Sequence, residues 1–313
     1  MLKVISEQGR PELATVYVGR MRDGSDKHLV EFVESVQPPI PRQSKWVIIV
    51  SSQFGCPIGC LMCDAGRKFS GNLTADEILA QIDYLITKYY PTGAVPVPKF
   101  KIQFARMGEP ALNPAVLEVL EQLPKRYKAE GLMPCIATIA PQGCDGFFER
   151  LIDIKNRLYS GDRFQLQFSI NTTDPAKRQE LMPYPKWTLA QIAGYGSRFH
   201  RPGDRKMTLN FAVAEGYPVD ADIIRRHFSP EQFLIKITPL NPTRQVASNK
   251  LKTYIDPNGA GQDNELVARF TQLGYDAILS IGEQEENQIG SNCGEFVSVL
   301  QDKSALVDTI GLL

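Results

Sequence analysis

The sequence predicts an α/β fold in which a mostly parallel sheet forms an open or partial (β/α) barrel. From about residue 45 onward, short apolar runs typical of buried strands alternate with amphipathic segments typical of helices. Strands that alternate with helices form parallel sheets, and 313 residues are enough for one barrel-sized domain. In such folds the chemistry lies at the C-terminal ends of the strands.

The first elements divide the chain into two parts. Residues 1–45 are expected to form a short N-terminal β extension, and residues 46–313 the barrel with a reactive-cysteine loop near its C-terminal end. The run 46–50, WVIIV, has the composition of a buried strand. Thr74 and Glu77 form a capping box that opens a helix with one apolar face.

The remaining elements repeat this alternation. Asn113, which a proline follows, is expected to begin a second helix. A third helix is expected near 146–156. Asp174, which a proline also follows, is expected to begin a further helix. Apolar runs predict further strands at 101–105, 135–139, 164–170, 207–213, 233–240 and 277–281.

Composition and apolar patterning disfavour several classes of protein. Lys and Arg number 35 and Asp and Glu number 35, so the formal charge is zero, which argues against a dedicated nucleic-acid binder. No apolar run approaches the roughly 20 residues needed to cross a bilayer. The first ten residues, MLKVISEQGR, lack the apolar core of a signal peptide. We therefore expect a cytoplasmic protein with no membrane partner.

The loop after the first barrel strand carries three cysteines, Cys56, Cys60 and Cys63, in a C-x3-C-x2-C spacing. A structural zinc site is the alternative. Zinc sites use four Cys or His ligands in paired spacing, but no His and no fourth Cys lies near these three cysteines in the sequence. A [4Fe–4S] cluster takes four ligands, so three cysteines leave one iron with an open position. This predicts a radical S-adenosylmethionine (SAM) enzyme.

Met107-Gly108-Glu109-Pro110 follows the second barrel strand. Alone, such a segment is a turn. Beside a cluster that binds SAM, Gly108 would let the backbone approach a ligand closely, and Glu109 would accept a hydrogen bond from an ammonium group.

Polar side chains also end two later strands. Ser169 and Asn171 close the strand at 164–170, and Asn241 follows the strand at 233–240. In a barrel they could hold the hydroxyls and ring nitrogens of a nucleoside. For Asn171 the alternative is helix capping, because Asp174 and a proline follow closely.

Cys293 lies in the polar, glycine-flanked run Gly290-Ser291-Asn292-Cys293-Gly294. An inert core cysteine prefers apolar surroundings, whereas this context suits an accessible, reactive thiol.

Together these segments resemble the RlmN/Cfr family of radical SAM adenine methyltransferases. The resemblance runs from about residue 14 to residue 296. Its blocks, in the family order, are SSQFGCPIGCLMC, NLTADEILAQI, MGEPALN, SIN, ELMP, TPLNP and SNCG. The resemblance implies a partial (β/α)6 barrel of the radical SAM type.

The resemblance also implies roles for residues. Cys56, Cys60 and Cys63 would hold the [4Fe–4S] cluster, and Cys293 would be converted to S-methylcysteine. A 5′-deoxyadenosyl radical from SAM would then remove a hydrogen from that methyl group, and the carbon radical would add to the substrate. The residues at SAM-contact positions would be Gly108, Glu109, Ser169, Asn171 and Asn241.

Glu34, in Val33-Glu34-Ser35-Val36, matches the family's acidic residue thought to act as a base, with a two-residue insertion before the cluster. Other positions depart from the pattern. Ala137 stands where the family has a SAM-contacting Ser, and Ile49 stands where it has a second cysteine that releases the substrate adduct. Cys135 or Cys144 could replace that thiol. Only about 50 residues precede Cys56, where family members carry a longer RNA-holding accessory domain.

Three functions therefore remain open. The first is methyl or methylene transfer to an adenine of RNA through Cys293. The second is related radical chemistry on a small molecule, nucleotide or peptide, which Ile49 and the short N-terminal part favour. The third is a non-catalytic iron–sulfur or RNA-binding protein. Either enzyme would need SAM, the cluster and an external reductant such as flavodoxin or ferredoxin.

Overall fold

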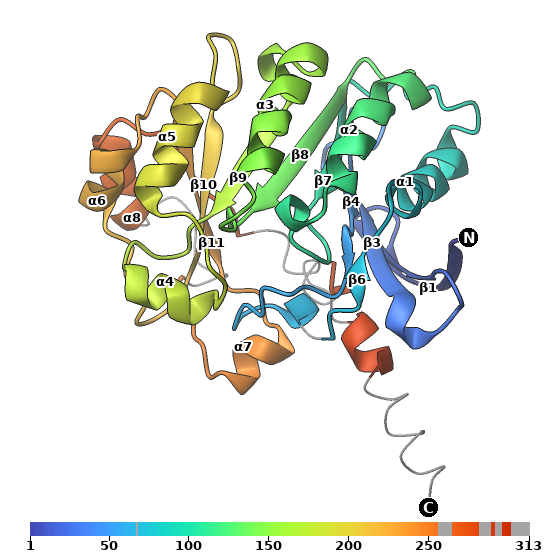
Figure 1. Ribbon diagram of the computed structural model, residues 1–313, viewed down its shortest axis with the longest axis horizontal. Helices are drawn as coiled ribbons and strands as arrows, with labels where there is room; N and C mark the ends of the chain where they lie inside the picture. The colour runs from blue at the N-terminus through green and yellow to red at the C-terminus, as the bar shows by residue number, and fades with distance from the viewer. Residues whose placement is uncertain (67, 256–264, 282–288, 292–295, 302–313) are drawn as a thin grey trace, which may run out of the picture.

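One ten-stranded sheet organises the molecule (Figure 1). The computed structural model describes residues 1–66, 68–255, 265–281, 289–291 and 296–301. The strands lie in the order β1 (Lys3–Arg10), β2 (Ala14–Arg20), β3 (Leu29–Ser35), β4 (Lys45–Val50), β7 (Lys99–Phe104), β8 (Leu132–Thr138), β9 (Gln165–Ser169), β10 (Met207–Val213), β11 (Phe233–Pro239) and β12 (Ala277–Leu279). Two further short strands, β5 (Gln53–Phe54) and β6 (Gly71–Asn72), pair with each other.

The sheet has a parallel part and an antiparallel part. In the part of the chain that the structure describes, β4 and the six strands beyond it run parallel to one another. These seven strands match the seven expected from the sequence, with ends that shift by at most three residues. The predicted α/β fold with a partial barrel is therefore confirmed.

The N-terminal β extension continues this sheet. β1, β2, β3 and β4 pair antiparallel in sequence, and Val33 of β3 lies opposite Ile49 of β4. The boundary between residues 1–45 and the rest is thus crossed by main-chain hydrogen bonds. The division into two domains stays a prediction.

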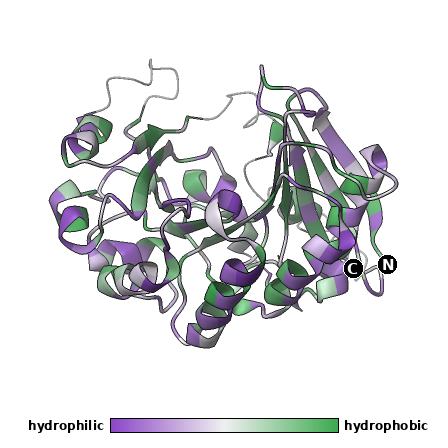
Figure 2. Ribbon diagram, turned by 90° about the horizontal axis from the view of Figure 1, so that it is seen from above, coloured by the Kyte–Doolittle hydropathy of each residue, from purple (hydrophilic) through white to green (hydrophobic). Residues whose placement is uncertain are grey.

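The outer, convex side of the curved sheet is covered by α1 (Ala75–Tyr89), α2 (Ala115–Arg126), α3 (Asp145–Leu158), α5 (Leu189–Phe199), α6 (Ala221–His227) and α8 (Glu265–Gln272) (Figures 1 and 2). Two short helices, α4 (Pro175–Leu181) and α7 (Arg244–Ser248), lie instead at the C-terminal ends of the strands (Figure 1). Alternate side chains of each strand point toward the outer helix layer, so Trp46, Ile48 and Val50 of β4 are fully buried in the main core. The intervening side chains face the inside of the barrel.

Local signals in the sequence set where the helices begin. The capping box before α1 is present: Thr74 Oγ1 accepts from Glu77 N at 3.2 Å and Glu77 Oε2 from Thr74 N at 2.9 Å. Asn113 Oδ1 accepts from Ala115 N at 3.1 Å at the start of α2. Asp174 Oδ1 accepts from two backbone N–H groups at the start of α4.

Among the described residues, none of the helices combines the length and apolar character that crossing a membrane requires.

Candidate active site

The cysteine loop leaves the C-terminal end of β4 and is fastened to the neighbouring strand end. Ser52 N donates to Met107 O at 2.8 Å, and Asn113 Nδ2 donates to Ser52 O at 2.7 Å and to Leu73 O at 2.8 Å. Asn113 is buried, so these bonds are shielded from water. The start of the loop is thus held against the end of β7.

The far end of the loop is held by α7. Asp64 accepts from Arg244 N at 3.2 Å and from Gln245 N at 2.9 Å, so its carboxylate faces the N-terminus of α7. Thr243 Oγ1 donates to Met62 O at 3.0 Å. Both ends of the cysteine loop therefore have fixed anchors.

Cys56, Cys60 and Cys63 are half-buried free thiols on this loop. Burial raises the pKa of all three, and the neighbouring thiols raise those of Cys56 and Cys60 further. A bound cation would favour the thiolate form of these thiols at neutral pH. Among the described residues, no three His, Cys, Asp or Glu side chains are arranged to hold a single metal ion. A cubane takes one thiolate per iron, so this all-sulfur donor set fits the cluster expected from the sequence.

Gly108 is required by packing against the cysteine loop. Its φ is +103°, and an added Cβ would lie 2.7 Å from Gln53 Cβ and from Ser52 Oγ. The space beside Gly108 is therefore filled by the protein itself.

Glu109 is a buried carboxylate that joins the ends of β7 and β8. It accepts hydrogen bonds from Thr138 Oγ1 at 2.5 Å, Ile139 N at 3.0 Å and Ala111 N at 3.0 Å. Burial raises its pKa to about 7 against the effect of these bonds. A carboxylate has about four acceptor positions, so Glu109 retains capacity for one more donor.

The other predicted SAM contacts lie at the ends of β9 and β11. Asn171 has a φ of +63°, and its Oδ1 accepts from Ala212 N of β10 at 3.0 Å. It does not cap α4, because Asp174 does so. Ser169 lies opposite Asn210 in the register of β9 and β10. Asn241 lines the cavity described next.

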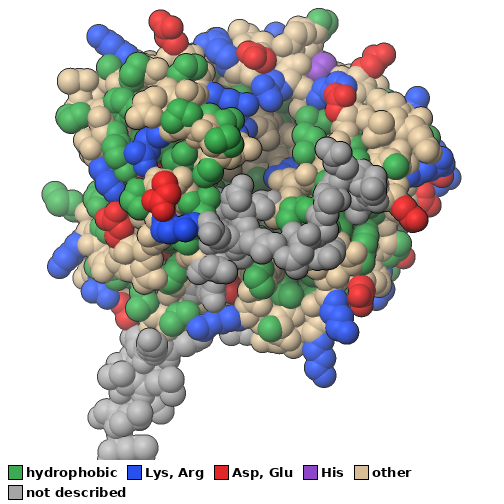
Figure 3. Space-filling model, turned by 180° about the vertical axis from the view of Figure 1, so that it is seen from behind, with side chains coloured by type: hydrophobic (Ala, Val, Ile, Leu, Met, Phe, Trp, Pro, Cys, Tyr) green, Lys and Arg blue, Asp and Glu red, His purple; other side chains and the backbone are tan. Residues whose placement is uncertain are grey.

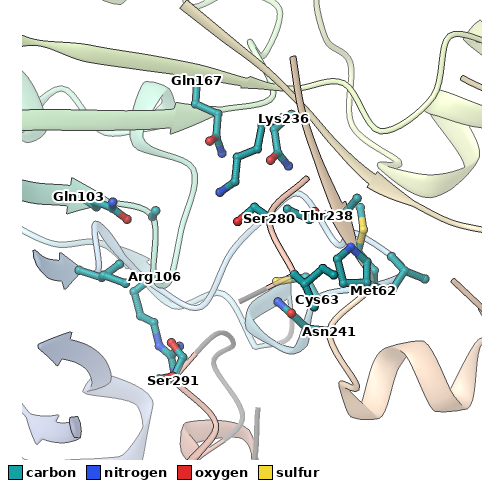
Figure 4. Close-up of a pocket in the computed structure, with 17 residues that line it drawn as sticks. Met62, Cys63, Gln103, Arg106, Gln167, Lys236, Thr238, Asn241, Ser280 and Ser291 are labelled. Carbon is teal, nitrogen blue, oxygen red and sulfur yellow. The ribbon is translucent and has the colours of Figure 1, made fainter. Parts of the chain in front are cut away.

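A cavity of about 430 Å³ lies inside the partial barrel (Figure 4). Met62 and Cys63 of the cysteine loop border it. The polar side chains that line it include Gln103, Arg106, Gln167, Asn210, Lys236 and Asn241. The space-filling view shows a hollow on this face, with Lys and Arg side chains along its upper margin (Figure 3).

Glu34 is not brought to this cavity. It lies opposite Ile48 of β4, whose side chain is buried under the helix layer. Its Oε1 accepts from Tyr17 Oη at 2.6 Å and Tyr89 Oη at 2.9 Å, and Lys88 Nζ lies 3.5 Å away. This position gives no support to the predicted role as a base, because a base must reach the reacting group.

Glu31, which the sequence did not indicate as a site residue, lies on the inner face of β3, the strand that also carries Glu34. It is fully buried and paired with Arg106, a residue that lines the cavity. Strand alternation was the available signal: residues three apart on a strand point to opposite faces, so Glu31 and Glu34 cannot both point inward.

Cys293 lies outside the described residues. Its flanks are described: Arg106 donates to Gly290 O at 2.9 Å and to Ser291 O at 2.5 Å, and Ser291 lines the cavity. Ile49 also lines the cavity, so the position of the absent second thiol faces inward. Cys135 is buried and Cys144 caps α3, and neither contributes to the cavity lining.

Comparison with known proteins places the chain in a family. No family model matches it. A curated protein from Phocaeicola vulgatus, named probable dual-specificity RNA methyltransferase RlmN, is 30% identical over 306 residues, covering 93% of this chain and 79% of that protein. The chain belongs to the RlmN family of radical SAM methyltransferases. A second RlmN, a dual-specificity RNA methyltransferase from Marinobacter nauticus, is 28% identical and covers 97% of this chain and 80% of that protein.

Solved structures show the same fold as this RlmN-family chain. A radical SAM methyltransferase from Sphaerobacter thermophilus superimposes with a TM-score of 0.69 at 19% identity, covering 94% of this chain and 80% of that one. SuiB from Streptococcus suis, solved with SAM bound, gives a TM-score of 0.52 at 14% identity, covering 78% of this chain and 52% of that one. Membership of the RlmN family makes the chain an enzyme, so a non-catalytic protein is set aside.

Proposed function

We propose that this enzyme uses SAM and a [4Fe–4S] cluster to transfer a one-carbon group through Cys293, with an adenine of RNA as the target. The observation that carries the proposal is the position of the cysteine loop. Cys63 and Met62 border the cavity at the C-terminal ends of the parallel strands, where Asn241 also lies. Chemistry in parallel α/β folds is located at this end of the sheet.

In this proposal Cys56, Cys60 and Cys63 hold the cluster through their thiolates. When bound, the cluster supplies the electron that cleaves SAM to methionine and a 5′-deoxyadenosyl radical, and a flavodoxin or ferredoxin supplies the reductant. Gly108 holds the main chain close to the loop, and Glu109 offers its remaining acceptor position to the SAM ammonium group.

Ser169, Asn171 and Asn241 would hold the nucleoside part of SAM. They lie at the C-terminal ends of β9 and β11, two parallel strands on either side of β10, so they lie at the same end of the barrel. Cys293 would accept a methyl group from one SAM molecule and carry it as a thioether, because a thiolate is a far better methyl acceptor than an aromatic carbon.

A second candidate is the same chemistry on a small molecule, nucleotide or peptide. Ile49 favours it, because an aliphatic side chain faces the cavity where the family uses a thiol to release its adduct. Two cations near the C-terminal end of α5 are also paired with acidic residues, which leaves less free charge there for RNA. They are Arg198, which pairs with Glu149 at 2.6 Å, and Lys206, which pairs with Asp276 at 2.6 Å.

The test is mass spectrometry of the Cys293 peptide from cluster-loaded enzyme after incubation with SAM and reductant. A peptide heavier by one methylene supports the carrier role despite Ile49. An unmodified peptide from protein that still produces 5′-deoxyadenosine would mean that the scaffold performs different radical chemistry. Turnover with structured RNA against a mononucleotide pool then separates the two targets, and a steep loss of affinity with salt supports RNA.

A further inference from the structure

Among the described residues, the cavity inside the barrel contains one cation that no side chain neutralises. Lys236 projects from the middle of β11 into the cavity, next to Gln167 (Figure 4). The other cation in the lining, Arg106, is paired with Glu31. No Asp or Glu belongs to the described lining, so this part of the lining carries a net positive charge from Lys236.

Three neutral amides from three other strands surround the same space. Gln103 of β7, Gln167 of β9 and Asn210 of β10 line the cavity, and in the register of the sheet Asn210 lies opposite Lys236. Within the described part of the chain, none of these four side chains makes a hydrogen bond to another residue, and Asn210 Oδ1 is buried without a partner. Buried polar groups are nearly always satisfied, so Asn210 Oδ1 is expected to accept from a water or a ligand.

Lys236 lies in the body of β11, three residues before its end at Pro239. The register of the sheet places it, through Asn210, level with Ser169, one of the predicted SAM contacts. The cysteine loop and the Gly108-Glu109 segment lie at the C-terminal rim, where the amino-acid end of SAM is expected. Lys236 is therefore set back from that rim along β11. An ammonium group that loses water without gaining a counter-ion is costly, and burial accordingly lowers the pKa of Lys236.

We propose that Lys236, with the amides of Gln167 and Asn210, receives an anionic group, a phosphate or a carboxylate, of a small substrate. This inference rests on the proposed function and selects its small-molecule form. A compact anion with several acceptor oxygens would accept from the ammonium group and from the amide nitrogens of Gln167 and Asn210, whereas Asn210 Oδ1 is itself an acceptor and takes a donor. A charged group set back from the rim of the barrel suits a mononucleotide or small acid, because the backbone of a polymer would have to enter with it.

The first experiment is titration calorimetry on SAM- and cluster-loaded enzyme with adenosine 5′-monophosphate, adenosine, inorganic phosphate and acetate. We expect the monophosphate to bind about 10- to 100-fold more tightly than adenosine. Competition by inorganic phosphate but not acetate would assign the anion as a phosphate, and the reverse as a carboxylate. Equal binding of the monophosphate and adenosine, with no binding of either anion, would overturn the proposal and leave water as the partner of Lys236.

The second experiment compares Lys236→Met and Lys236→Gln with Lys206→Met, which removes a surface lysine paired with Asp276. Both Lys236 variants should lose the preference for the anion while Lys206→Met keeps it. Circular dichroism checks folding, and the Gln variant serves if the Met variant fails to fold. An equal loss of SAM affinity would show that Lys236 serves SAM and would overturn the proposal, as would Lys236-dependent binding of an RNA oligonucleotide but not of the mononucleotide.

These measurements separate this proposal from the proposed function. Anion binding that depends on Lys236 but occurs without 5′-deoxyadenosine formation or Cys293 methylation would support the anion site and refute the methyltransferase mechanism. Methylated Cys293 with no anion preference would do the reverse.

Discussion

Glu31 and Arg106 form a buried ion pair that links the N-terminal strands to the segment carrying Cys293. Two nitrogens of the Arg106 guanidinium donate to the same carboxylate oxygen, Glu31 Oε2. Nε lies 3.2 Å from it and Nη2 lies 2.5 Å from it. Arg106 also donates to Gly290 O and Ser291 O, and Glu31 Oε1 accepts from Val297 N at 2.6 Å. The pair thus holds the chain on both sides of residues 292–295.

Breaking the ion pair between Glu31 and Arg106 is expected to destabilise the protein and to reduce the methylation of Cys293. Arg106→Met leaves Glu31 charged and buried, which typically costs about 3–5 kcal/mol. We expect chemical denaturation to show this loss and mass spectrometry to show less methylated Cys293, with iron content unchanged. Arg198→Met is the matched control, because it breaks an exposed pair with Glu149 of 2.6 Å and should cost under about 1 kcal/mol. Equal effects of the two substitutions would contradict the prediction.

Glu34→Gln tests whether Glu34 acts as a base. Because Glu34 lies under the helix layer with Tyr17, Tyr89 and Lys88, we expect a stability loss of about 1–3 kcal/mol and an unchanged turnover rate below the unfolding temperature. Single-turnover kinetics at several temperatures would separate the two effects. A rate that drops by orders of magnitude in folded protein would restore the base role.

SAM affinity is expected to fall as the pH drops below about 7. The pKa of Glu109 is raised to about 7 by burial, so its carboxylate gains a proton on acidification and can no longer hold an ammonium group by charge. Equilibrium dialysis with labelled SAM between pH 6 and 8.5 would show this. Glu109→Gln should bind SAM weakly at every pH, whereas Glu118→Gln, on the surface helix α2, should behave as wild type. A flat wild-type profile would refute the role.

Lys101→Met is expected to stabilise the protein at neutral pH. Burial, with smaller contributions from nearby lysines and an arginine, lowers the pKa of Lys101 to about 8. Its charged form is therefore disfavoured in the folded state, a cost fully present below pH 8 and lost as the pH rises toward the unfolded value of about 10.4. We expect a gain of about 2 kcal/mol at pH 7 that shrinks by pH 10, measured by denaturant unfolding. Lys99→Met, an exposed residue on the same strand, should change little.

Cys60→Ala is expected to abolish iron binding and SAM cleavage, because two thiolates from the loop cannot replace three. Cys135→Ala should leave both intact, since Cys135 is packed in the sheet away from the loop. Cys293→Ala should keep the cluster and SAM cleavage but yield no product. Iron analysis, 5′-deoxyadenosine and product assays check these outcomes, and product from Cys293→Ala would end the carrier hypothesis.

The positions of the strands along the chain and the helix starts could be predicted because they depend on local patterns. The alternation in β4 and the capping box of Thr74 and Glu77 are readable over a few residues. The inward or outward direction of a side chain could not be predicted in the same way. Glu31 and Glu34 look equivalent in LVEFVES, and only the pairing of Val33 with Ile49 decides which one faces the barrel.

The position of Lys236 inside the cavity could not be predicted for a related reason. In FLIKITP it alternates with isoleucines and resembles an exposed position of a half-buried strand. The curved sheet places that face inside a cavity bordered by strands distant in sequence. The cysteine motif was found because its ligands are close in sequence, whereas the amides around Lys236 come from strands separated by whole helices.

The pairing of the N-terminal strands with the barrel limits how the protein can be divided into fragments. β3 pairs with β4 along one edge, and Glu31 on that strand reaches across to Arg106 and Val297. A fragment that begins at residue 46 would expose the edge of β4 and leave the Arg106 guanidinium buried without its carboxylate. We therefore expect the barrel to lose stability when it is separated from residues 1–45, and fusions or domain exchanges should keep these residues with it.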